Sequence, residues 1–433
     1  MNVELVNTGS ELMLGRVLNT HQQWLCRRLA DLGQVVTRQV AIADAGSEIQ
    51  QAVREALGRA DLVITTGGLG PTSDDITREL IAALLGKKLV ENRDVLAHIE
   101  GFFAQRNRVR PPKTGVETLV PEGAIVFLNR TGTAPGLAMK VERNADGTLK
   151  AADGGKTAPP SSRSPAWLVM LPGPPRELRP MFDESVVPLL QRELAQEIFV
   201  CRTLRSTGIG ESRVEELVAA DLQPLVQAGL GIGYCARPGA VDVRLTASGA
   251  QAAALVRDGE GIVQKIMGAN IFGFDDDEIE QVVVRLLTER QQTLALVESC
   301  TGGNIAHRVT NVPGASVVFT GGVVSYANAV KETFMGVKPE TLRQHGAVSE
   351  PVAREMALGA RERLGADFAL AVTGIAGPGG GTPEKPVGTV FIALASAGGV
   401  TVKKMLNPWD RVTFKDVTAT QALELLRMSL LSA

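Results

Sequence analysis

The sequence has few cysteines, no long apolar run and almost no net charge, and each of these shortages excludes a class of protein. Its four cysteines lie far apart and none belongs to a CxxC pair, so neither a zinc knuckle nor a thioredoxin-type motif is present. No apolar run reaches the roughly 18 residues of a membrane-spanning helix. A formal charge of −2 on 433 residues does not indicate the positive charge that would attract nucleic acid or an acidic membrane surface.

The first residues also lack a basic region followed by an apolar stretch, because a strand-like run begins directly at residues 3–6. We therefore expect no secretory signal. Widely spaced free thiols are typical of a reducing compartment, so we expect a cytoplasmic protein.

The chain is long enough for two to four domains, and 44% of its residues are hydrophobic. Apolar runs at residues 3–6, 34–42 and 62–65 alternate with helical patterns, which predicts an α/β fold with a doubly wound parallel sheet. Ligands bind beyond the carboxyl ends of the strands in such sheets. We therefore expect the loops after Val6 and Thr65 to lie close together.

Composition suggests how the chain divides into domains. Residues 146–165 are rich in Gly, Ala, Ser and Pro, and we interpret them as a flexible hairpin extension within a domain. A composition shift near residues 180–200 suggests a boundary. We predict three domains, which span residues 1–176, 177–253 and 254–433: a doubly wound domain, a small α+β domain and a second α/β domain.

In the last domain, Ser299 stands between an apolar strand and a helix that begins after two glycines. Such a turn exposes a side chain beside backbone N–H groups that could stabilise an oxyanion. A serine needs a base to become a nucleophile. Neither His307 nor His345 has an obvious carboxylate partner, so a Ser-His-Asp arrangement is not favoured.

Lys331 is the alternative base, because a lysine can accept a proton once burial lowers its pKa. Tyr326, five residues earlier, could relay a proton or orient a substrate. The glycine-rich residues 373–381 follow a strand and could approach a phosphate through their backbone. Each feature also has an ordinary interpretation as a turn, a solvated lysine or a loop. Their occurrence together favours function.

Three segments, ESCTGG, GGVVSYANAVKETFMGV and AVTGIAGPGGGTPEKPVGTVFIAL, resemble the C-terminal domain of the CinA family, which is similar to nicotinamide mononucleotide deamidases. The resemblance implies that Ser299 and Lys331 form a catalytic pair assisted by Tyr326. The substrate contacts that it implies are Thr301, Gly302, Gly303, Ser316, Thr373 and Arg411. Lys415 stands where the family often has a second arginine.

The reaction implied by this resemblance is hydrolysis of nicotinamide mononucleotide to nicotinate mononucleotide and ammonia. Ser299 would attack the amide carbon while Lys331 takes its proton, and Lys331 would then protonate the leaving ammonia. Backbone groups near Gly302 and Gly303 would hold the oxyanion. The scheme needs no cofactor.

In the first domain, glycine-rich residues 67–75 follow the third strand and lead into a helix. Glycines let a backbone approach a phosphate, and a helix N-terminus favours an anion. Asp74 and Asp75 could cap that helix. Alternatively, Glu11, Asp44 and Asp75 could gather a hard cation such as Mg²⁺ near a bound pyrophosphate.

Four segments of this region, TGSELMLGRVLNT, TTGGLGPTSDDITRE, FLNRTGTAPGLAM and LPGPPRE, resemble the molybdopterin-binding fold of the MoaB and MogA type, in the version found in CinA proteins. The resemblance implies metal-dependent ADP-ribose pyrophosphatase activity, with Asp44 and Asp75 as ligands of Mg²⁺, Mn²⁺ or Co²⁺. The substrate contacts that we expect with it are Glu11, Gly67, Gly68, Gly70 and Asp74. Ala45 follows Asp44 where a second polar residue is common.

The middle domain resembles the KH-type fold of CinA proteins. A KH domain binds RNA through a GxxG loop, but Gly208-Ile209-Gly210-Glu211 lacks that spacing and brings an acidic side chain. This argues for a structural or dimerisation role.

We therefore expect a two-activity homodimeric enzyme of pyridine nucleotide recycling, which acts on nicotinamide mononucleotide and ADP-ribose and binds neither a membrane nor nucleic acid. One alternative is that the first domain is an inactive ligand-binding or assembly module. A molybdenum-cofactor protein would leave the C-terminal motifs unexplained. The charge gives no support to a nucleic-acid factor of DNA uptake or repair.

Overall fold

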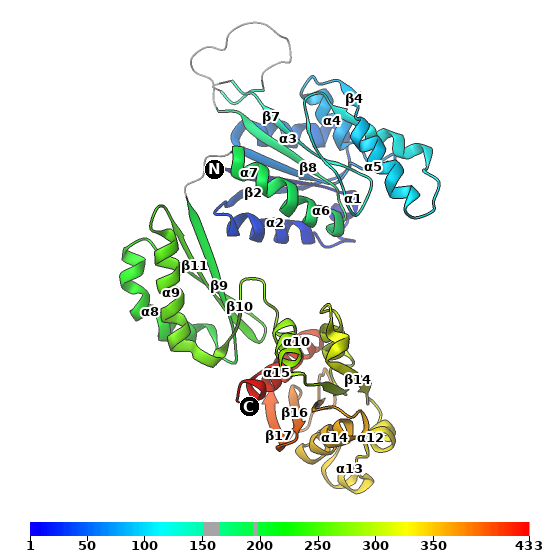
Figure 1. Cartoon of the computed structure of the whole chain (residues 1–433), viewed down its shortest axis with the longest axis vertical. Coiled ribbons are helices and arrows are strands. Elements are labelled where there is room, and N and C mark those ends of the chain that lie inside the picture. The colour runs from blue at the N-terminus through cyan, green and yellow to red at the C-terminus, as the bar shows by residue number, and fades with distance from the viewer. Residues whose placement is uncertain (145, 150–163, 194–197, 433) are drawn as a thin grey trace. The chain divides into compact units, whose positions relative to one another are not determined.

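The computed structural model describes residues 1–144, 146–149, 164–193 and 198–432, which form two compact units, Met1–Val200 and Cys201–Ala433 (Figure 1). Most of the expected hairpin extension at residues 146–165 lies outside the described residues. No helix in the described part of the chain is long and apolar enough to cross a membrane.

The first unit is built on a six-stranded sheet in the order β2-β1-β3-β8-β7-β6. The strands are β1 (Val3–Thr8), β2 (Val36–Ile42), β3 (Leu62–Thr66), β6 (Ile125–Phe127), β7 (Gly136–Val141) and β8 (Ala166–Leu171). The first four in this order pair in parallel, whereas β7 and β6 add an antiparallel edge. The predicted doubly wound sheet is confirmed, with an antiparallel extension that the sequence did not predict.

Helices cover both faces of this sheet (Figure 1). Residues of α2 (Thr20–Asp31), α6 (Pro175–Met181) and α7 (Val187–Glu193) share one core with Leu5 and Ile64. Residues of α3 (Gly46–Arg59), α4 (Thr77–Leu84) and α5 (Arg93–Ala104) share the opposite core with Val6 and Val63. Alternate residues of one strand face opposite layers, so strands covered on both sides are mostly apolar along their length. Glu4 and Asn7 of β1 are buried polar exceptions.

Shorter elements complete the first unit: α1 (Ser10–Met13), the paired strands β4 (Leu89–Glu91) and β5 (Leu119–Pro121), the 3-10 helix η1 (Pro112–Thr118) and the π-helical turn η2 (Phe182–Val186). The loops after β1 and β3 meet as expected, because the Thr8 hydroxyl donates a hydrogen bond to the carbonyl of Thr66 at 3.2 Å.

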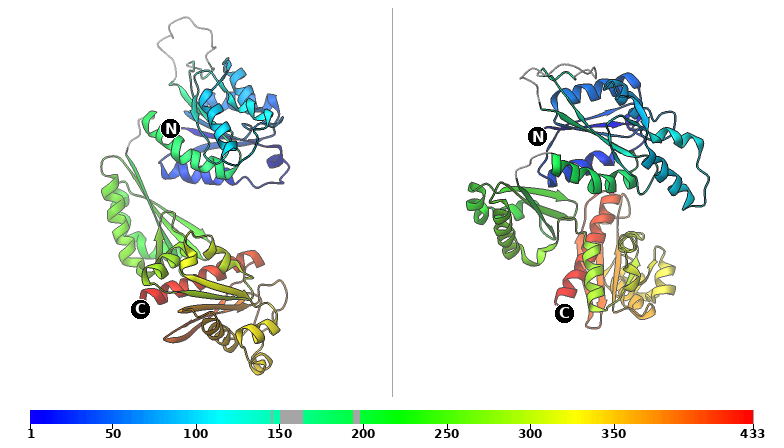
Figure 2. Two further views of the ribbon diagram at one scale, coloured as in Figure 1. Left: turned by 45° about the vertical axis from the view of Figure 1, so that its right-hand side comes forward. Right: turned by 45° about the horizontal axis from the view of Figure 1, so that its top comes forward.

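The second unit begins with a four-stranded sheet in the order β10-β11-β9-β12. Its elements are β9 (Phe199–Thr207), α8 (Glu211–Gln227), β10 (Gly231–Arg237), β11 (Ala240–Ser248), α9 (Ala252–Met267), the 3-10 turn η3 (Gly268–Asn270) and β12 (Ile271–Phe274). Helices α8 and α9 pack against each other on one face of the sheet (Figure 2). This is the small α+β fold predicted for the middle of the chain.

The rest of the second unit is a five-stranded sheet in the order β14-β13-β15-β16-β17. Its strands are β13 (Leu294–Glu298), β14 (Phe319–Val324), β15 (Phe368–Gly374), β16 (Thr389–Ser396) and β17 (Gly399–Leu406). The first three in this order are parallel and the last two antiparallel. The predicted C-terminal α/β fold is confirmed.

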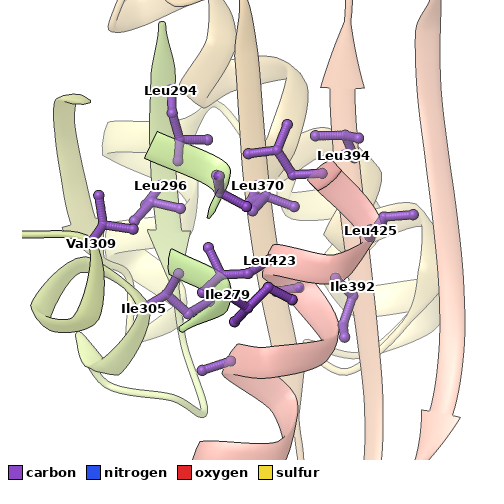
Figure 3. Packing of buried hydrophobic residues seen from close by; sticks show 14 of the residues in the cluster. Ile279, Leu294, Leu296, Ile305, Val309, Leu370, Ile392, Leu394, Leu423 and Leu425 are labelled. Carbon is purple, nitrogen blue, oxygen red and sulfur yellow. The ribbon is translucent and has the colours of Figure 1, made fainter. Parts of the chain in front are cut away.

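Two helical layers enclose this sheet. Figure 3 shows α10 (Ile279–Arg290), α11 (Asn304–Thr310) and α15 (Arg411–Ser432) packed on one face, where Leu423 of α15 lies among the strand leucines. On the other face lie α12 (Asn328–Met335), α13 (Pro339–His345) and α14 (Glu350–Arg363), and the 3-10 turn η4 (Ala315–Val317) precedes β14.

The predicted domain boundaries at 176/177 and 253/254 fall within helices α6 and α9, respectively. The described chain divides most clearly between Val200 and Cys201. The three-domain division stays a prediction.

Candidate active site

The turn after β13 presents Ser299. The Ser299 N–H donates to the carbonyl of Val372 in the neighbouring strand at 3.0 Å, which anchors the turn to the sheet. Gly302 and Gly303 then adopt φ values of +62° and +94°, which glycine reaches without strain. These two residues reverse the chain into α11, so the turn predicted from the sequence is present.

Glu298 anchors this turn through its side chain, a role that we did not predict from the sequence. Its buried carboxylate accepts hydrogen bonds from the N–H groups of Gly303 at 2.9 Å, Ile305 at 3.1 Å and Ala306 at 2.8 Å. A negative charge at these otherwise unpaired donors stabilises the start of α11. The signal was an acidic residue at the end of an apolar strand, immediately before the serine.

Lys331 lies against Ser299. Its Nζ atom donates to the Ser299 hydroxyl at 3.2 Å and to the carbonyl oxygens of Ser325 at 2.6 Å and Tyr326 at 3.2 Å. Only 1% of the residue is exposed, and this burial lowers the pKa of Lys331. An amine with a lowered pKa beside a hydroxyl is the arrangement required for a lysine base.

Cys300 offers a second nucleophilic side chain in the same turn. Its thiol is buried, and burial raises the pKa of Cys300 to about 12. The thiol therefore stays neutral at physiological pH, and a neutral thiol is a poor nucleophile. Ser299, which has Lys331 at its hydroxyl, is the better placed group.

The side chains of Tyr326 and Arg411 are hydrogen-bonded to each other. Arg411 donates from Nη2 to the Tyr326 hydroxyl at 2.7 Å and from Nη1 to the Gly377 carbonyl at 2.8 Å. Tyr326 reaches Lys331 through its main-chain carbonyl, while its half-exposed ring extends to Arg411. This geometry favours the expected substrate-orienting role of the tyrosine over a direct proton relay to Lys331.

These residues surround a cavity of about 290 Å³. It is lined by Ser299, Cys300, Tyr326, Asn328, Lys331, Ala347, Val348, Thr373, Gly374, Ile375, Ala376, Gly377, Gly379, Gly380 and Arg411. The structure thus brings together five predicted site residues and the glycine-rich loop. Thr373 is held by a hydrogen bond to the Ala347 carbonyl at 2.8 Å. Asn328, at the start of α12, is a lining residue that the sequence interpretation missed.

Four other predicted residues are not among those that line this cavity in the described chain: Thr301, Gly302, Gly303 and Ser316. Ser316 is exposed on η4, and Thr301 is buried. The N–H groups of Gly302 and Gly303 already donate to the Ser299 carbonyl and the Glu298 carboxylate, so neither is free for an oxyanion. Lys415 lies near this turn, since a Cβ atom built on Gly302 would stand 3.7 Å from its Nζ.

A second cavity, of about 450 Å³, lies at the carboxyl ends of the parallel strands in the first unit. All seven residues predicted for an N-terminal site line it: Glu11, Asp44, Gly67, Gly68, Gly70, Asp74 and Asp75. Glu117 and Glu177 line it as well, although the sequence interpretation missed both. Glu117 lies in η1, far from the glycine-rich segment in sequence, and no short motif marks it. Glu177 lies in α6 and is the last residue of the segment LPGPPRE, so that segment was the signal that could have identified it.

The two expected metal ligands are occupied by local hydrogen bonds. Asp44 accepts from the Ser10 N–H at 2.8 Å, and Asp75 accepts from the Thr72 N–H at 2.9 Å and from the Thr72 hydroxyl. Within the described ranges, no three His, Cys, Asp or Glu side chains converge on a point where a metal ion could sit. The residues therefore do not fit a metal site built from protein ligands alone. Neither Asp74 nor Asp75 caps α4, whose N-cap is Ile76 without a side-chain hydrogen bond.

The folds and the cavities define a multidomain α/β protein with a serine–lysine pair in its last part. Family models match this chain in three consecutive segments: "Probable molybdopterin binding domain" at residues 4–192, "Damage-inducible protein CinA KH domain" at 201–273 and "CinA C-terminal domain" at 276–430. A CinA-like protein of Akkermansia muciniphila is 43% identical over 98% of this chain and 96% of its own length. The chain belongs to the CinA family.

Two solved structures are similar to about a third of this chain. The competence/damage inducible protein CihA from Agrobacterium tumefaciens is 41% identical, with a TM-score of 0.34, and matches 36% of this chain and 96% of its own. A CinA superfamily protein from Klebsiella pneumoniae is 33% identical, with a TM-score of 0.35, over 36% of this chain and 97% of its own.

Proposed function

We propose that the C-terminal part of the chain is a nicotinamide-nucleotide amidohydrolase, which converts nicotinamide mononucleotide and water to nicotinate mononucleotide and ammonia. One observation carries the proposal: the buried Nζ of Lys331 stands 3.2 Å from the Ser299 hydroxyl, at a cavity whose wall includes a glycine-rich loop. The CinA family membership supports it.

The proposed reaction passes through an ester of Ser299. Neutral Lys331 takes the Ser299 proton as the oxygen attacks the carboxamide carbon, and then gives that proton to the nitrogen, which leaves as ammonia. Lys331 next takes a proton from water, whose oxygen attacks the ester carbon. The acid product leaves when Ser299 regains its proton from Lys331.

The cavity offers different surroundings to the two ends of this substrate. Ala347, Val348 and Ile375 provide apolar contacts for a pyridine ring. Gly377 and Arg411 lie on the side where a phosphate would be held, since backbone N–H groups and a guanidinium are the usual phosphate ligands. We propose Tyr326 and Thr373 as residues that position the nucleotide between these two ends.

The test is ammonia release from nicotinamide mononucleotide by the full chain and two variants. Ser299→Ala and Lys331→Met should each lower kcat by about a thousandfold, the usual cost of removing a nucleophile or its base. Cys300→Ala is the matched control in the same turn and should stay within about threefold. Equal rates for wild type and Ser299→Ala would exclude this mechanism.

As a second candidate function, we propose that the N-terminal cavity binds ADP-ribose and hydrolyses its diphosphate in the presence of Mg²⁺, Mn²⁺ or Co²⁺. The supporting observation is the glycine-rich loop on the cavity wall. Gly67 and Gly68 have φ values of +99° and +68°, and a Cβ atom on Gly68 would lie 2.0 Å from the Thr77 hydroxyl. We assign no chemical step to a metal, because Asp44 and Asp75 do not form a metal site by themselves.

The assay for this second activity is AMP formation from ADP-ribose with each metal ion and with EDTA. Asp75→Asn should abolish it, because the variant removes a negative charge from the cavity wall, while the amide oxygen can still accept the hydrogen bond from the Thr72 N–H. If wild type binds ADP-ribose without hydrolysing it under any of these conditions, the domain is a ligand-binding module.

A further inference from the structure

Glu117 occupies an unusual position in the wall of the N-terminal cavity. Its side chain is fully buried at the end of η1, and Thr133 donates to one carboxyl oxygen, Oε1, at 3.0 Å. The other oxygen, Oε2, has no hydrogen-bond partner within the described part of the chain. A buried polar atom without a partner destabilises a fold by about as much as a lost hydrogen bond. Its presence at a cavity points to a partner on a ligand.

The charges that face Glu117 come from three elements. Asp75 in the glycine-rich loop and Glu177 in α6 are carboxylates, and Arg78 in α4 is a buried cation. Burial is the main reason that the pKa of Glu117 is raised to about 7. The two nearby carboxylates also raise this pKa, whereas the hydrogen bond from Thr133 and the charge of Arg78 lower it. A neutral carboxyl group both donates and accepts, as the amide of Asn or Gln does.

Aromatic rings lie on the adjoining wall. Phe102 and Phe103, near the end of α5, line the same cavity, and α5 packs against η1. The two rings meet edge to face with centroids 5.8 Å apart, which fixes the orientation of Phe102. The Arg106 guanidinium lies 3.6 Å from the centroid of Phe102 and covers one face, so a ligand ring would stack on the other.

We propose that Phe102 and Glu117 form a nucleobase subsite in the N-terminal cavity, where the ring of Phe102 stacks on the base and the carboxyl group of Glu117 pairs with its edge. The base must present an adjacent donor and acceptor, as adenine does, because that edge matches a group that both donates and accepts. Aromatic stacking adds affinity for any base, whereas the edge contact provides selectivity. This inference rests on the proposed binding of ADP-ribose at the same cavity.

Backbone donors decide the orientation of the ligand, because acidic side chains line the cavity both at the glycine-rich loop, with Asp74 and Asp75, and at Glu117 and Glu177. A diphosphate at the glycine-rich loop would meet backbone N–H groups. The base therefore belongs at the wall formed by η1 and α5, and the diphosphate at residues 67–70.

The two halves of ADP-ribose, AMP and ribose 5-phosphate, test the subsite by equilibrium binding to the full chain without turnover. We expect Phe102→Ala and Glu117→Leu to weaken AMP binding by about tenfold or more. Ribose 5-phosphate binding should stay within about twofold of wild type. Glu117→Gln keeps one donor and one acceptor, so its AMP affinity should stay within about threefold. Wild type should prefer AMP to purine riboside 5′-monophosphate, which lacks the 6-amino donor, and Glu117→Leu should lose that preference.

Several results would overturn the inference. Unchanged AMP affinity in Glu117→Leu would show that Oε2 is a buried atom without a hydrogen-bond partner and does not contact the ligand. Equal weakening of AMP and ribose 5-phosphate would show that the variants disturb the cavity and not a base subsite. Thermal melting followed by the fluorescence of Trp24 and Trp167, which lie in the first unit, checks that each variant is folded. Failure of the proposed hydrolysis appears separately, as AMP binding without any cleavage of ADP-ribose.

Discussion

Lys331 determines how the proposed amidase responds to pH. A protonated lysine cannot act as a base, and burial lowers the pKa of Lys331 below that of an exposed lysine. We expect kcat/KM for ammonia release to rise with pH as Lys331 loses its proton, and then to level off at a pH below the ordinary lysine pKa. Lys331→Arg should stay protonated and lose at least about a hundredfold in kcat/KM at every pH. A rate that falls through this range as pH rises would contradict the assignment.

Glu298 positions the turn that carries Ser299 but does not line the cavity. Its removal therefore tests the structural role of this carboxylate and not a role in the chemical step. Glu298→Ala leaves three N–H groups at the start of α11 without an acceptor. We expect a loss of about 2 kcal/mol or more in stability and a lower kcat with little change in KM. Glu298→Gln retains an acceptor oxygen and should lose less of both. The midpoint of urea inactivation and steady-state kinetics measure these effects, and a variant with wild-type values for both would show that the cap is dispensable.

At the scale of elements, the loop between β3 and α4 depends on glycine. Gly68→Ala should destabilise the first unit by about 2 kcal/mol or more, because it combines a positive φ with a Cβ atom 2.0 Å from Thr77. Gly101→Ala, within α5, is the matched control: no atom lies within 4 Å of its added Cβ, and alanine favours a helix by about 0.5–1 kcal/mol. Thermal melting followed by Trp24 and Trp167 fluorescence compares them, and equal melting temperatures would contradict the prediction.

The elements were easier to predict than the contacts between them. Apolar runs identified β1, β3 and β13, because apolar residues predominate in strands covered on both faces, although Glu4 and Glu298 are buried polar exceptions. The antiparallel edge of β7 and β6 was missed, since pairing direction depends on the path of the chain through space. The resemblance carried by the motif around Lys331 implied its pairing with Ser299, and the two side chains lie in hydrogen-bond contact.

Side-chain partners were the part that the sequence could not provide. Glu117 reaches its cavity through the packing of η1 on α5, and nothing in the residues around it marks that contact. Asp44 and Asp75 do line one cavity, as expected, yet each accepts a backbone hydrogen bond: Asp44 from Ser10, 34 residues away, and Asp75 from Thr72, three residues away. Backbone geometry determines such bonds, and residue spacing alone does not reveal them.

At the scale of the whole molecule, the even balance of charge makes a prediction about partners. Counterion release drives most non-specific nucleic-acid binding and needs a cluster of basic residues. With a net charge of −2, and with Glu211 at the start of α8, directly after the turn that stands in place of a KH-type GxxG loop, we expect no salt-dependent gel shift with single-stranded RNA or double-stranded DNA. A shift that weakens steeply with salt would reopen the nucleic-acid hypothesis.

Light scattering on the same sample tests the predicted homodimer.

The two cavities belong to units with separate hydrophobic cores, and this separation predicts independent activities. The N-terminal cavity is lined by residues up to Glu177, and the cavity at Ser299 by residues from Ser299 to Arg411. Among the residues that the structure describes, none lines both cavities. Ser299→Ala should therefore abolish ammonia release while ADP-ribose hydrolysis stays within about twofold of wild type, and Asp75→Asn should do the reverse. Loss of both activities in either variant would mean that the units depend on each other for folding or function. Melting curves recorded by tryptophan fluorescence would separate these two causes, because Trp24 and Trp167 report on the first unit and Trp409 on the second.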